Sequence, residues 1–286
     1  MPAPVLSSEA FATAVERLAA HRDRVVVVKL GGSAMEDPAA TEACLRSVAA
    51  LFSLGVDLVL VHGGGRPIDR AMAEAGLTPK KVAGRRYTDE ATLGIVVAVL
   101  FEINAALVRH LRGLPGKSEQ AISVLYGRRL LLSGLDDKPI DLGRVGEVTR
   151  VDTATLHRHL ENGEVPVVPS LALDDHGNWL NVNADTAASA VAGALQADKA
   201  IFLTDTPGVL RDRANPASLI PRLTEREARE LIAAGVIDGG MVPKVQACFE
   251  ALASGAKSAL ILDGRVPYSL LDVFLRDTFT GTAISR

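Results

Sequence analysis

The order of residues from position 25 to position 33 constrains the fold more than any other stretch of the chain. Four valines, at 25–28, are typical of a strand that is buried on both faces of a parallel sheet. Lys29 follows at once, and a lysine is costly to bury unless an anionic group meets it. Gly31 and Gly32 come next, and glycines let the backbone turn sharply and bring bare N–H groups close to a ligand. We therefore expect a phosphate site at the carboxyl end of a first core strand.

A second strand has the same arrangement. The apolar residues 58–61 run into His62 and the glycines 63–65, and a helix is predicted over 67–76. In a doubly wound sheet both glycine turns lie at the same carboxyl edge, where ligands bind. Three consecutive glycines lose much backbone entropy, which favours a ligand-facing loop over a plain tight turn. A histidine after a strand is often only a hydrogen-bonded support.

Other periodic segments predict further helices and a strand-rich insertion. Helices are expected over 38–54, opened by Pro38, over 90–112, capped by Thr88 or Asp89, and over 153–161, capped by Asp152 or Thr153. Short strands are predicted at Ile122–Leu125, Val145–Val151 and Val165–Val168, and together they indicate a β-rich flap or lid beside the main sheet.

A helix over 7–21 precedes the first core strand, with Ser7 or Ser8 as its cap. It need not belong to the domain core. It can pack on its own subunit, or it can be an arm exchanged between subunits, and the sequence leaves both open.

The composition excludes several classes of protein. The chain has 286 residues, a net charge of −3 and an isoelectric point of about 6.1, so no basic surface for nucleic acid is expected. Cys44 and Cys248 lie in apolar helical patterns, which argues against a disulfide and for a reducing cytoplasm. We expect no signal peptide, no apolar run of membrane-spanning length and a cytoplasmic location.

Polar residues before a small-residue helix form a third candidate motif, residues 181–185. Asn183 can cap the helix from Thr186 to about Leu195, and Asp185 suits its first turn. Capping does not explain Asn181, so a functional role is favoured. Alanine and serine along this helix also predict close packing against a neighbour.

Two turns and a helix start follow in the last third of the chain. The strand 199–203 ends in the turn 204–210, which suits a nucleotide edge and a plain turn equally. Pro243 fits a first helical position. Lys244 is then in the first turn, where the helix dipole disfavours a cation by ~0.3–1 kcal/mol. A bound anion would make Lys244 and the free N–H groups its partners.

Two further stretches are candidates for anion binding. Within residues 80–89, Arg85 or Arg86 could grip a carboxylate through a bidentate pair, and spacing does not choose between them. Residues 113–118 look like the end of a Walker A loop. Leu111 stands where that motif needs glycine, and a helix precedes the loop where a strand is required. This stretch is therefore predicted to be a turn.

Together these pieces favour phosphoryl transfer, which needs mainly positioning and charge neutralisation. Lys29 and Lys244 can supply positive charge, and Asp185 would hold the two ammonium groups apart. An acceptor that is already a carboxylate needs no general base, and the sequence offers no obvious one. No pattern of metal-ligand histidines is present, so no residue is predicted to bind a metal ion.

The motifs resemble those of the amino acid kinase family, in the family's order from about residue 25 to the end. The matching segments are 29–35, 62–65, 84–89, 181–185, 203–210 and 239–244. The resemblance implies a three-layer αβα sandwich with a mainly parallel central sheet. It also implies a residue 1–24 helix that can serve as an oligomerisation arm, an acyl-amino-acid lobe over 25–195 and a nucleotide lobe over 196–286.

The resemblance further implies roles for single residues. Lys29 and Lys244 would stabilise the transferring phosphoryl group, with Asp185 organising them. Gly64 and Gly65 would supply backbone donors, and Arg86 and Asn181 would bind the acceptor substrate. ATP would be bound by Gly31, Gly32, Asp205, Thr206, Pro207, Gly208, Val209, Leu210, Val236, Ile237 and Asp238.

The activity implied is ATP-dependent phosphorylation of the γ-carboxylate of N-acetyl-L-glutamate in arginine biosynthesis, with Mg²⁺ carried by ATP. A homodimer or hexamer and arginine as an effector are also implied. Residues 101–105 and Tyr268 depart from the family pattern in the oligomer and feedback regions, which puts feedback control in question. Two alternatives stay open: a sister kinase acting on carrier-linked α-aminoadipate in lysine synthesis, and a silent nucleotide- or arginine-binding regulator.

Overall fold

A computed structural model describes residues 7–31, 35–82, 85–133, 139–276 and 278–286. Its helices are α1 (Ser8–Ala19), α2 (Pro38–Ser53), α3 (Gly65–Glu74), α4 (Glu90–Arg112), α5 (Thr153–Glu161), α6 (Ala184–Ala194), the 3₁₀ helix η2 (Pro216–Ser218), α7 (Glu225–Ala233), α8 (Met241–Ser254) and α9 (Ser269–Leu275). Its strands are β1 (Val25–Leu30), β2 (Asp57–His62), β3 (Lys81–Val82), β4 (Arg85–Arg86), β5 (Ser118–Gln120), β6 (Leu125–Ser133), β7 (Pro139–Val151), β8 (Val165–Pro169), β9 (Leu171–Leu173), β10 (Trp179–Val182), β11 (Lys199–Thr204), β12 (Arg222–Thr224), β13 (Ala259–Asp263) and β14 (Gly281–Ser285).

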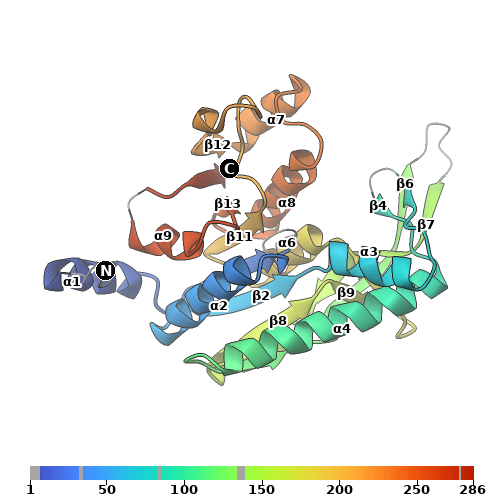
Figure 1. Cartoon of the computed structure of the whole chain (residues 1–286), viewed down its shortest axis with the longest axis horizontal. Helices are drawn as coiled ribbons and strands as arrows, with labels where there is room; N and C mark the ends of the chain where they lie inside the picture. Colours follow the sequence, from blue (N-terminus) through green and yellow to red (C-terminus); the bar gives the residue numbers. More distant parts are fainter. Residues whose placement is uncertain (1–6, 32–34, 83–84, 134–138, 277) are drawn as a thin grey trace.

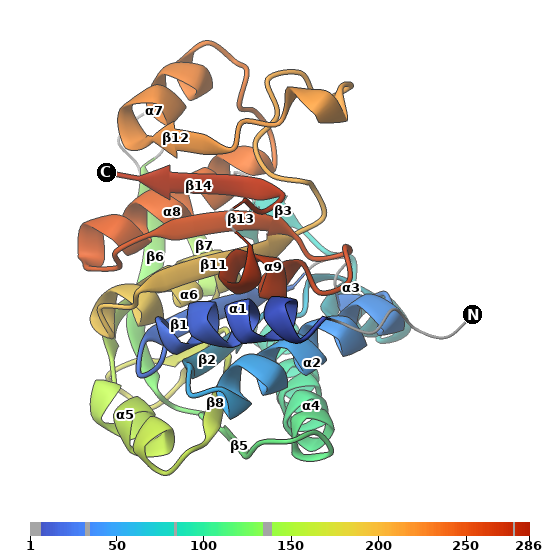
Figure 2. The ribbon, with the colours of Figure 1, turned by 90° about the vertical axis from the view of Figure 1, so that its left-hand side faces the viewer.

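One large sheet organises the molecule. Its strand order is β12-β14-β13-β11-β1-β2-β8-β5, and every neighbouring pair is parallel except β13 and β14. Helices α1, α2 and α9 lie on one side of it and α6 and α8 on the other (Figures 1 and 2). The predicted three-layer α/β sandwich with a mainly parallel sheet is confirmed. The sheet passes without a break from β1 to β11, so the lobe boundary at 195/196 stays a prediction.

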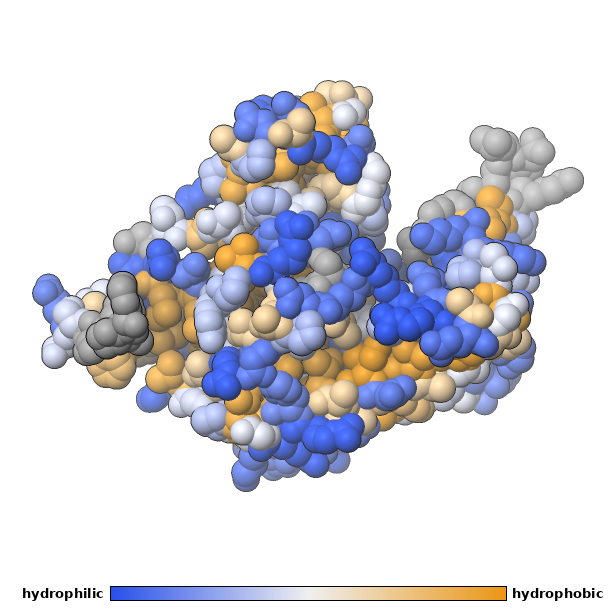
Figure 3. Space-filling view, viewed as in Figure 1, coloured by the Kyte–Doolittle hydropathy of each residue, from blue (hydrophilic) through white to orange (hydrophobic). Residues whose placement is uncertain are grey.

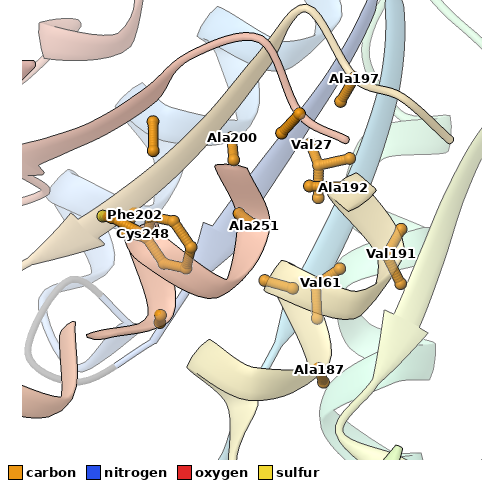
Figure 4. Close-up of a cluster of buried hydrophobic side chains, with 14 of the residues drawn as sticks. Val27, Val61, Ala187, Val191, Ala192, Ala197, Ala200, Phe202, Cys248 and Ala251 are labelled. Carbon is orange, nitrogen blue, oxygen red and sulfur yellow. The ribbon is translucent and has the colours of Figure 1, made fainter. Parts of the chain in front are cut away.

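The alternation of side chains along a strand decides which residues face which helices. On β1, Val27 belongs to one buried cluster with residues of α6 and α8 (Figure 4). Val26 and Val28 belong to another cluster, which includes residues of α2 and α4. Lys29 follows Val28, so it faces the α6 side. On β2 the same alternation turns His62 toward α4.

A small barrel of β10, β7, β6 and β9 stands beside the sheet, which confirms the predicted β-rich flap. The long hairpin of β6 and β7 makes most of it. The strand predicted over Ile122–Leu125 is wrong in its first part. Ile122 and Ser123 form a turn, Ser123 has a φ of 66°, and β6 begins only at Leu125.

Helices α6 and α8 pack closely, as the alanines and serines of α6 predict. Ser189 Oγ lies 2.8 Å from Asp185 O and 2.7 Å from Ala247 O, and its one proton is shared between the two carbonyls, so it links the two helices. A Cβ atom on Gly193 would lie 2.3 Å from Ser254 Cβ. We call this contact the α6–α8 seam. It leaves no space for a side chain at Gly193.

Most predicted helix ends are confirmed. The caps are Ser7 for α1, Asp89 for α4, Asp152 for α5 and Asn183 for α6. One start is wrong: α8 begins at Met241, so Pro243 is its third residue. Helix α7 was not predicted, although its capping box, Thr224 with Glu227, is visible in the sequence.

Helix α4 has the length and hydropathy of a membrane-crossing helix, contrary to the expectation that no apolar run would reach that length. No other helix of the described residues meets that test. A core helix meets it too, and one face of α4 packs on α3, β8 and β10. Its half-exposed apolar side chains follow the helix axis, and an apolar band is seen there in Figure 3. Cys44 and Cys248 are both buried and free, as predicted.

Candidate active site

Two cavities open at the carboxyl ends of the parallel strands. The first, which we call the Lys29 cavity, has a volume of about 280 Å³. It is lined by Lys29, Gly31, Gly63, Gly64, Gly65, Ile68, Arg86, Val145, Ser170, Asn181, Val182, Asn183, Ala184 and Asp185. Strands β1, β2, β8 and β10 therefore meet here, as the two glycine turns predicted.

A buried ion pair lies in the Lys29 cavity. Lys29 Nζ is 2.9 Å from Asp185 Oδ1, and the two side chains are 10% and 12% exposed. Asn183 caps α6 by accepting hydrogen bonds from the N–H groups of Asp185 and Thr186, which fixes the carboxylate at the helix start. A Cβ atom on Gly31 would lie 2.9 Å from Lys29 Nζ, so only glycine leaves room for this lysine conformation.

The glycine turn after β2 leads directly into α3. Gly64 is the N-cap residue of α3, and no side chain caps this helix. A helix start without a side-chain cap leaves N–H groups that suit an anion. Gly64 also packs against α4, because a Cβ atom there would lie 3.0 Å from both Ile103 and Leu100 side chains.

The polar wall of the Lys29 cavity includes Arg86, which the sequence could not separate from Arg85. Its Nη2 lies 2.5 Å from Asp69 Oδ1 on α3 and donates to Gly65 O at 3.3 Å. Asn181 donates from Nδ2 to Thr88 Oγ1 at 3.1 Å. Arg86 thus brings a guanidinium, the group suited to a carboxylate, close to the glycine turn.

The second cavity, which we call the Lys244 cavity, has a volume of about 360 Å³. It is lined by Thr204, Asp205, Thr206, Gly208, Val209, Leu210, Arg213, Val236, Ile237, Asp238, Gly240, Met241 and Lys244. The end of β11, the loop after it and the start of α8 form its walls. Gly208 has a φ of 139° and lies against Thr282, so a side chain there would be strained and crowded.

Lys244 lies at the rim of this cavity and is apart from the buried ion pair. Its ammonium donates to Gly240 O at 3.2 Å, one turn back on its own helix. No contact between Lys244 and Asp185 is found among the described residues, so the structure does not bring the predicted trio together. Gly240 gives α8 no side-chain cap, and the helix start faces the cavity that holds Lys244.

The structure separates the predicted nucleotide residues in three ways. Gly31 lines the Lys29 cavity, whereas Pro207 lines neither of the two cavities. Gly32 lies outside the described residues. The other predicted positions, within 205–210 and 236–238, line the Lys244 cavity together.

Sequence reasoning missed Arg213 and Ser170. Arg213 pairs with Asp238 across the Lys244 cavity, with Nη1 2.7 Å from Oδ1. Ser170 follows β8 and lines the Lys29 cavity. Ser170 lies two positions after the predicted strand Val165–Val168 and Arg213 three positions after the predicted turn 204–210, but neither stands out by residue type.

Comparisons with known proteins agree with this geometry. The model of the amino acid kinase family matches residues 24–263. An acetylglutamate kinase from Acaryochloris marina is 41% identical over 263 residues, which cover 92% of each chain.

Solved structures give the same relationship at the level of the fold. The N-acetylglutamate synthase of Neisseria gonorrhoeae, complexed with coenzyme A and N-acetyl-glutamate, superposes with a TM-score of 0.85 at 26% identity. The match covers 99% of this chain and 64% of that one, so the present chain spans about two thirds of that protein. A carbamate kinase from Giardia lamblia bound to AMP-PNP has a TM-score of 0.64 at 15% identity, covering 92% and 99% of the two chains.

Proposed function

The chain belongs to the amino acid kinase family, and we propose that it phosphorylates the γ-carboxylate of N-acetyl-L-glutamate with ATP, as in arginine biosynthesis. The buried pair of Lys29 and Asp185 is the observation that carries the proposal. A site that only binds nucleotide has no need of a charged pair held beside glycine donors. This pair therefore argues against the silent regulator.

The Lys29 cavity is proposed to hold the acceptor. Arg86 would grip the α-carboxylate through its guanidinium, and Asn181 would contact the acetylated amino acid. The γ-carboxylate would then lie near Lys29 and the glycine turn. The guanidinium and the uncapped helix start both suit an acidic acceptor.

The Lys244 cavity is proposed to hold ATP. The loop residues 205–210 and 236–238 would line the nucleotide, and the N–H groups at the start of α8 would face its phosphates. In the reaction a γ-carboxylate oxygen attacks the γ-phosphorus, the bond to the bridging β–γ oxygen breaks, and ADP leaves. The carboxylate is ionised at neutral pH, so no general base is required.

Lys29 and Lys244 would neutralise the charge of the phosphoryl group on its path between the two cavities. Since the only described residue that Lys244 hydrogen-bonds is Gly240, we propose that the nucleotide lobe, residues 196–286, approaches the lobe 25–195 when both substrates are bound. Asp185 would then lie between the two ammonium groups.

Magnesium is proposed to arrive with ATP. Within the described ranges no group of three His, Cys, Asp or Glu side chains could hold a metal ion. Mg²⁺ commonly binds through substrate phosphates and one or two carboxylates. Asp205 and Asp238 line the Lys244 cavity and would be the carboxylates available there to such an ion.

A homo-oligomer is proposed from two apolar surfaces. Helix α4 has half-exposed apolar side chains along one face, seen as a band in Figure 3. Phe11 and Val15 on α1 are 63% and 41% exposed, which suits an arm that covers them in a dimer or hexamer. We also propose that arginine regulates the enzyme as an effector and that the protein is located in the cytoplasm.

A coupled ADP-release assay with purified protein tests the proposal. N-acetyl-L-glutamate, L-glutamate and L-α-aminoadipate are compared at one ATP concentration. We expect turnover with N-acetyl-L-glutamate to dominate. Turnover with another carboxylate but none with this one would overturn the assignment, and a flat response to added arginine would remove the effector.

A further inference from the structure

A fully buried histidine and asparagine lie beneath the glycine turn of the Lys29 cavity. His62 ends β2 and Asn104 is on α4, and both have 0% relative exposure. Asn104 Nδ2 lies 3.1 Å from His62 Nε2 and donates to Val167 O at 2.9 Å. His62 Nδ1 lies 3.1 Å from Gly63 O.

These contacts define the tautomer of the imidazole. A carbonyl oxygen can only accept, so the amide nitrogen of Asn104 must face Val167. The same nitrogen then faces His62 Nε2, which must accept. The single proton of the neutral ring is therefore on Nδ1, which donates to Gly63 O. Burial lowers the pKa of His62 to about 4, in agreement with a neutral ring.

The hydrogen bond to Gly63 O fixes the orientation of one peptide group. No described peptide bond is cis, so the carbonyl of Gly63 and the N–H of Gly64 point in opposite directions. The carbonyl points back to the buried imidazole. The N–H of Gly64 consequently points away from the imidazole, and both Gly63 and Gly64 line the cavity. Among the described residues, none accepts a hydrogen bond from this N–H.

Asn104 bears an energetic penalty that packing alone does not explain. Its Oδ1 is buried, and no described residue donates to it. An apolar residue of similar size would avoid this penalty. The role of the Asn104 amide nitrogen, which sets the tautomer of His62, explains why an amide is present here.

We propose that His62 and Asn104 are positioning residues, which aim the N–H of Gly64 at the oxygens of the transferring phosphoryl group. This inference rests on the proposed kinase activity. Neither residue touches a substrate. The pair acts through the backbone of the glycine turn, and the histidine takes no part in proton transfer.

Kinetics of two His62 variants test the proposal. An asparagine side chain can place an N–H donor where Nδ1 lies, whereas leucine has no donor. We expect His62→Leu to lower kcat by about 10²-fold, the loss typical of one oxyanion donor, with little change in KM for N-acetyl-L-glutamate. His62→Asn should recover most of that loss. Equal kcat in the two variants, or a loss confined to KM, would contradict the proposal.

A matched control is available on α5. His159 is half-buried, and its Nδ1 lies 2.8 Å from Glu164 Oε2, away from both cavities. His159→Leu should therefore leave kcat unchanged. Melting temperatures are measured for every variant, because a merely structural role predicts that losses follow stability and that asparagine gives no rescue.

Nitrogen-15 NMR of the imidazole tests the geometry in the unmodified protein. At neutral pH we expect His62 as the Nδ1–H tautomer, with its signal identified by its absence in His62→Asn or, if that variant does not fold, by its shift in Asn104→Ala. An Nε2–H tautomer would overturn the proposal. An inactive wild type with the expected tautomer would instead count against the kinase activity alone, so the two failures are distinguishable.

Discussion

The two cavities hold their lysines in opposite ways. Lys29 extends from a central strand into a buried ion pair, and its carboxylate partner is fixed by a helix cap. Lys244 is on the first turn of a helix, and its ammonium donates to the backbone carbonyl of the N-cap residue, Gly240, with no other hydrogen-bond partner among the described residues. The ammonium group of Lys29 is therefore held in place by the core, whereas a bound ligand can set the position of the ammonium group of Lys244. With the proposed assignment of the two cavities a kinase gains from both, because the acceptor side would be fixed and the nucleotide side would exchange ADP for ATP.

The largest effect is expected at Lys29. Lys29→Met should lower kcat by about 10²–10³-fold, because a charge on the phosphoryl path is lost. It should also lower the free energy of unfolding by about 3–5 kcal/mol, because Asp185 stays buried without its partner. Steady-state kinetics and urea unfolding measure the two.

The double variant Lys29→Met with Asp185→Leu separates these effects. It should regain stability, because no unpaired charge remains, but not activity. Stability that is unchanged in the single variant would show that Asp185 does not depend on Lys29.

A substitution of Lys244 should affect kcat but not the free energy of unfolding. Lys244→Met should lower kcat by about 10²-fold and leave KM for N-acetyl-L-glutamate nearly unchanged. Its free energy of unfolding should change by no more than about 0.5 kcal/mol, because Gly240 O is the one hydrogen-bond partner of the ammonium in the part of the chain that the structure describes.

Lys257→Met is the control for this variant, since Lys257 lies just before β13 at the opposite end of the sheet. It should keep full activity. Equal losses of turnover and acetylglutamate binding in Lys244→Met would contradict the phosphoryl role.

The Lys29 cavity should also make the free energy of unfolding depend on pH, because the imidazole of His62 is buried beneath its glycine turn. Burial lowers the pKa of His62 to about 4, so the unfolded chain, with an ordinary pKa of 6.5, binds the proton more readily. Stability should therefore fall as pH decreases from about 7 to 4, by about 3 kcal/mol in total. Urea unfolding at several pH values measures this.

The slope between pH 6.5 and 4 should largely disappear in His62→Asn. The helix-capping carboxylates Asp89 and Asp152 have pKa values lowered by backbone hydrogen bonds, first of all from Thr92 and Thr155. Their contribution is lost only below their ordinary values near 4, so the two windows are separable. A slope that persists in His62→Asn would point to another group.

The smallest effect is expected at Asp69, whose carboxylate holds Arg86 from the side of α3. Asp69→Asn should raise KM for N-acetyl-L-glutamate by about three- to tenfold, because a charge-assisted contact to the guanidinium is weakened. KM for ATP should not change, since Arg86 lines only the Lys29 cavity. A parallel rise of both constants would mean that Asp69 stabilises the whole site.

Motifs were predictable where chemistry and local structure coincide. The valine strand with Lys29, the Pro38 helix start and the Asn183 cap each follow from neighbouring residues. The pairs of Arg86 with Asp69 and of His62 with Asn104 join residues 17 and 42 positions apart, which no local pattern contains. The position of Lys244 could not be predicted either, because it depends on where α8 lies relative to α6. The strand predicted at Ile122 failed because a short apolar run does not distinguish a strand from a partly buried turn.

The α6–α8 seam has a consequence for dissecting this protein. The seam joins a helix before residue 195 to one after it, and β1 pairs with β11 across the same point. In a fragment that ends at 195, the backbone groups of β1 that face β11 would be unpaired, and the alanine side chains of α6 that pack on α8 would be exposed to water. We expect that neither fragment folds stably in solution when it is produced alone. The two fragments should associate and fold when they are produced together.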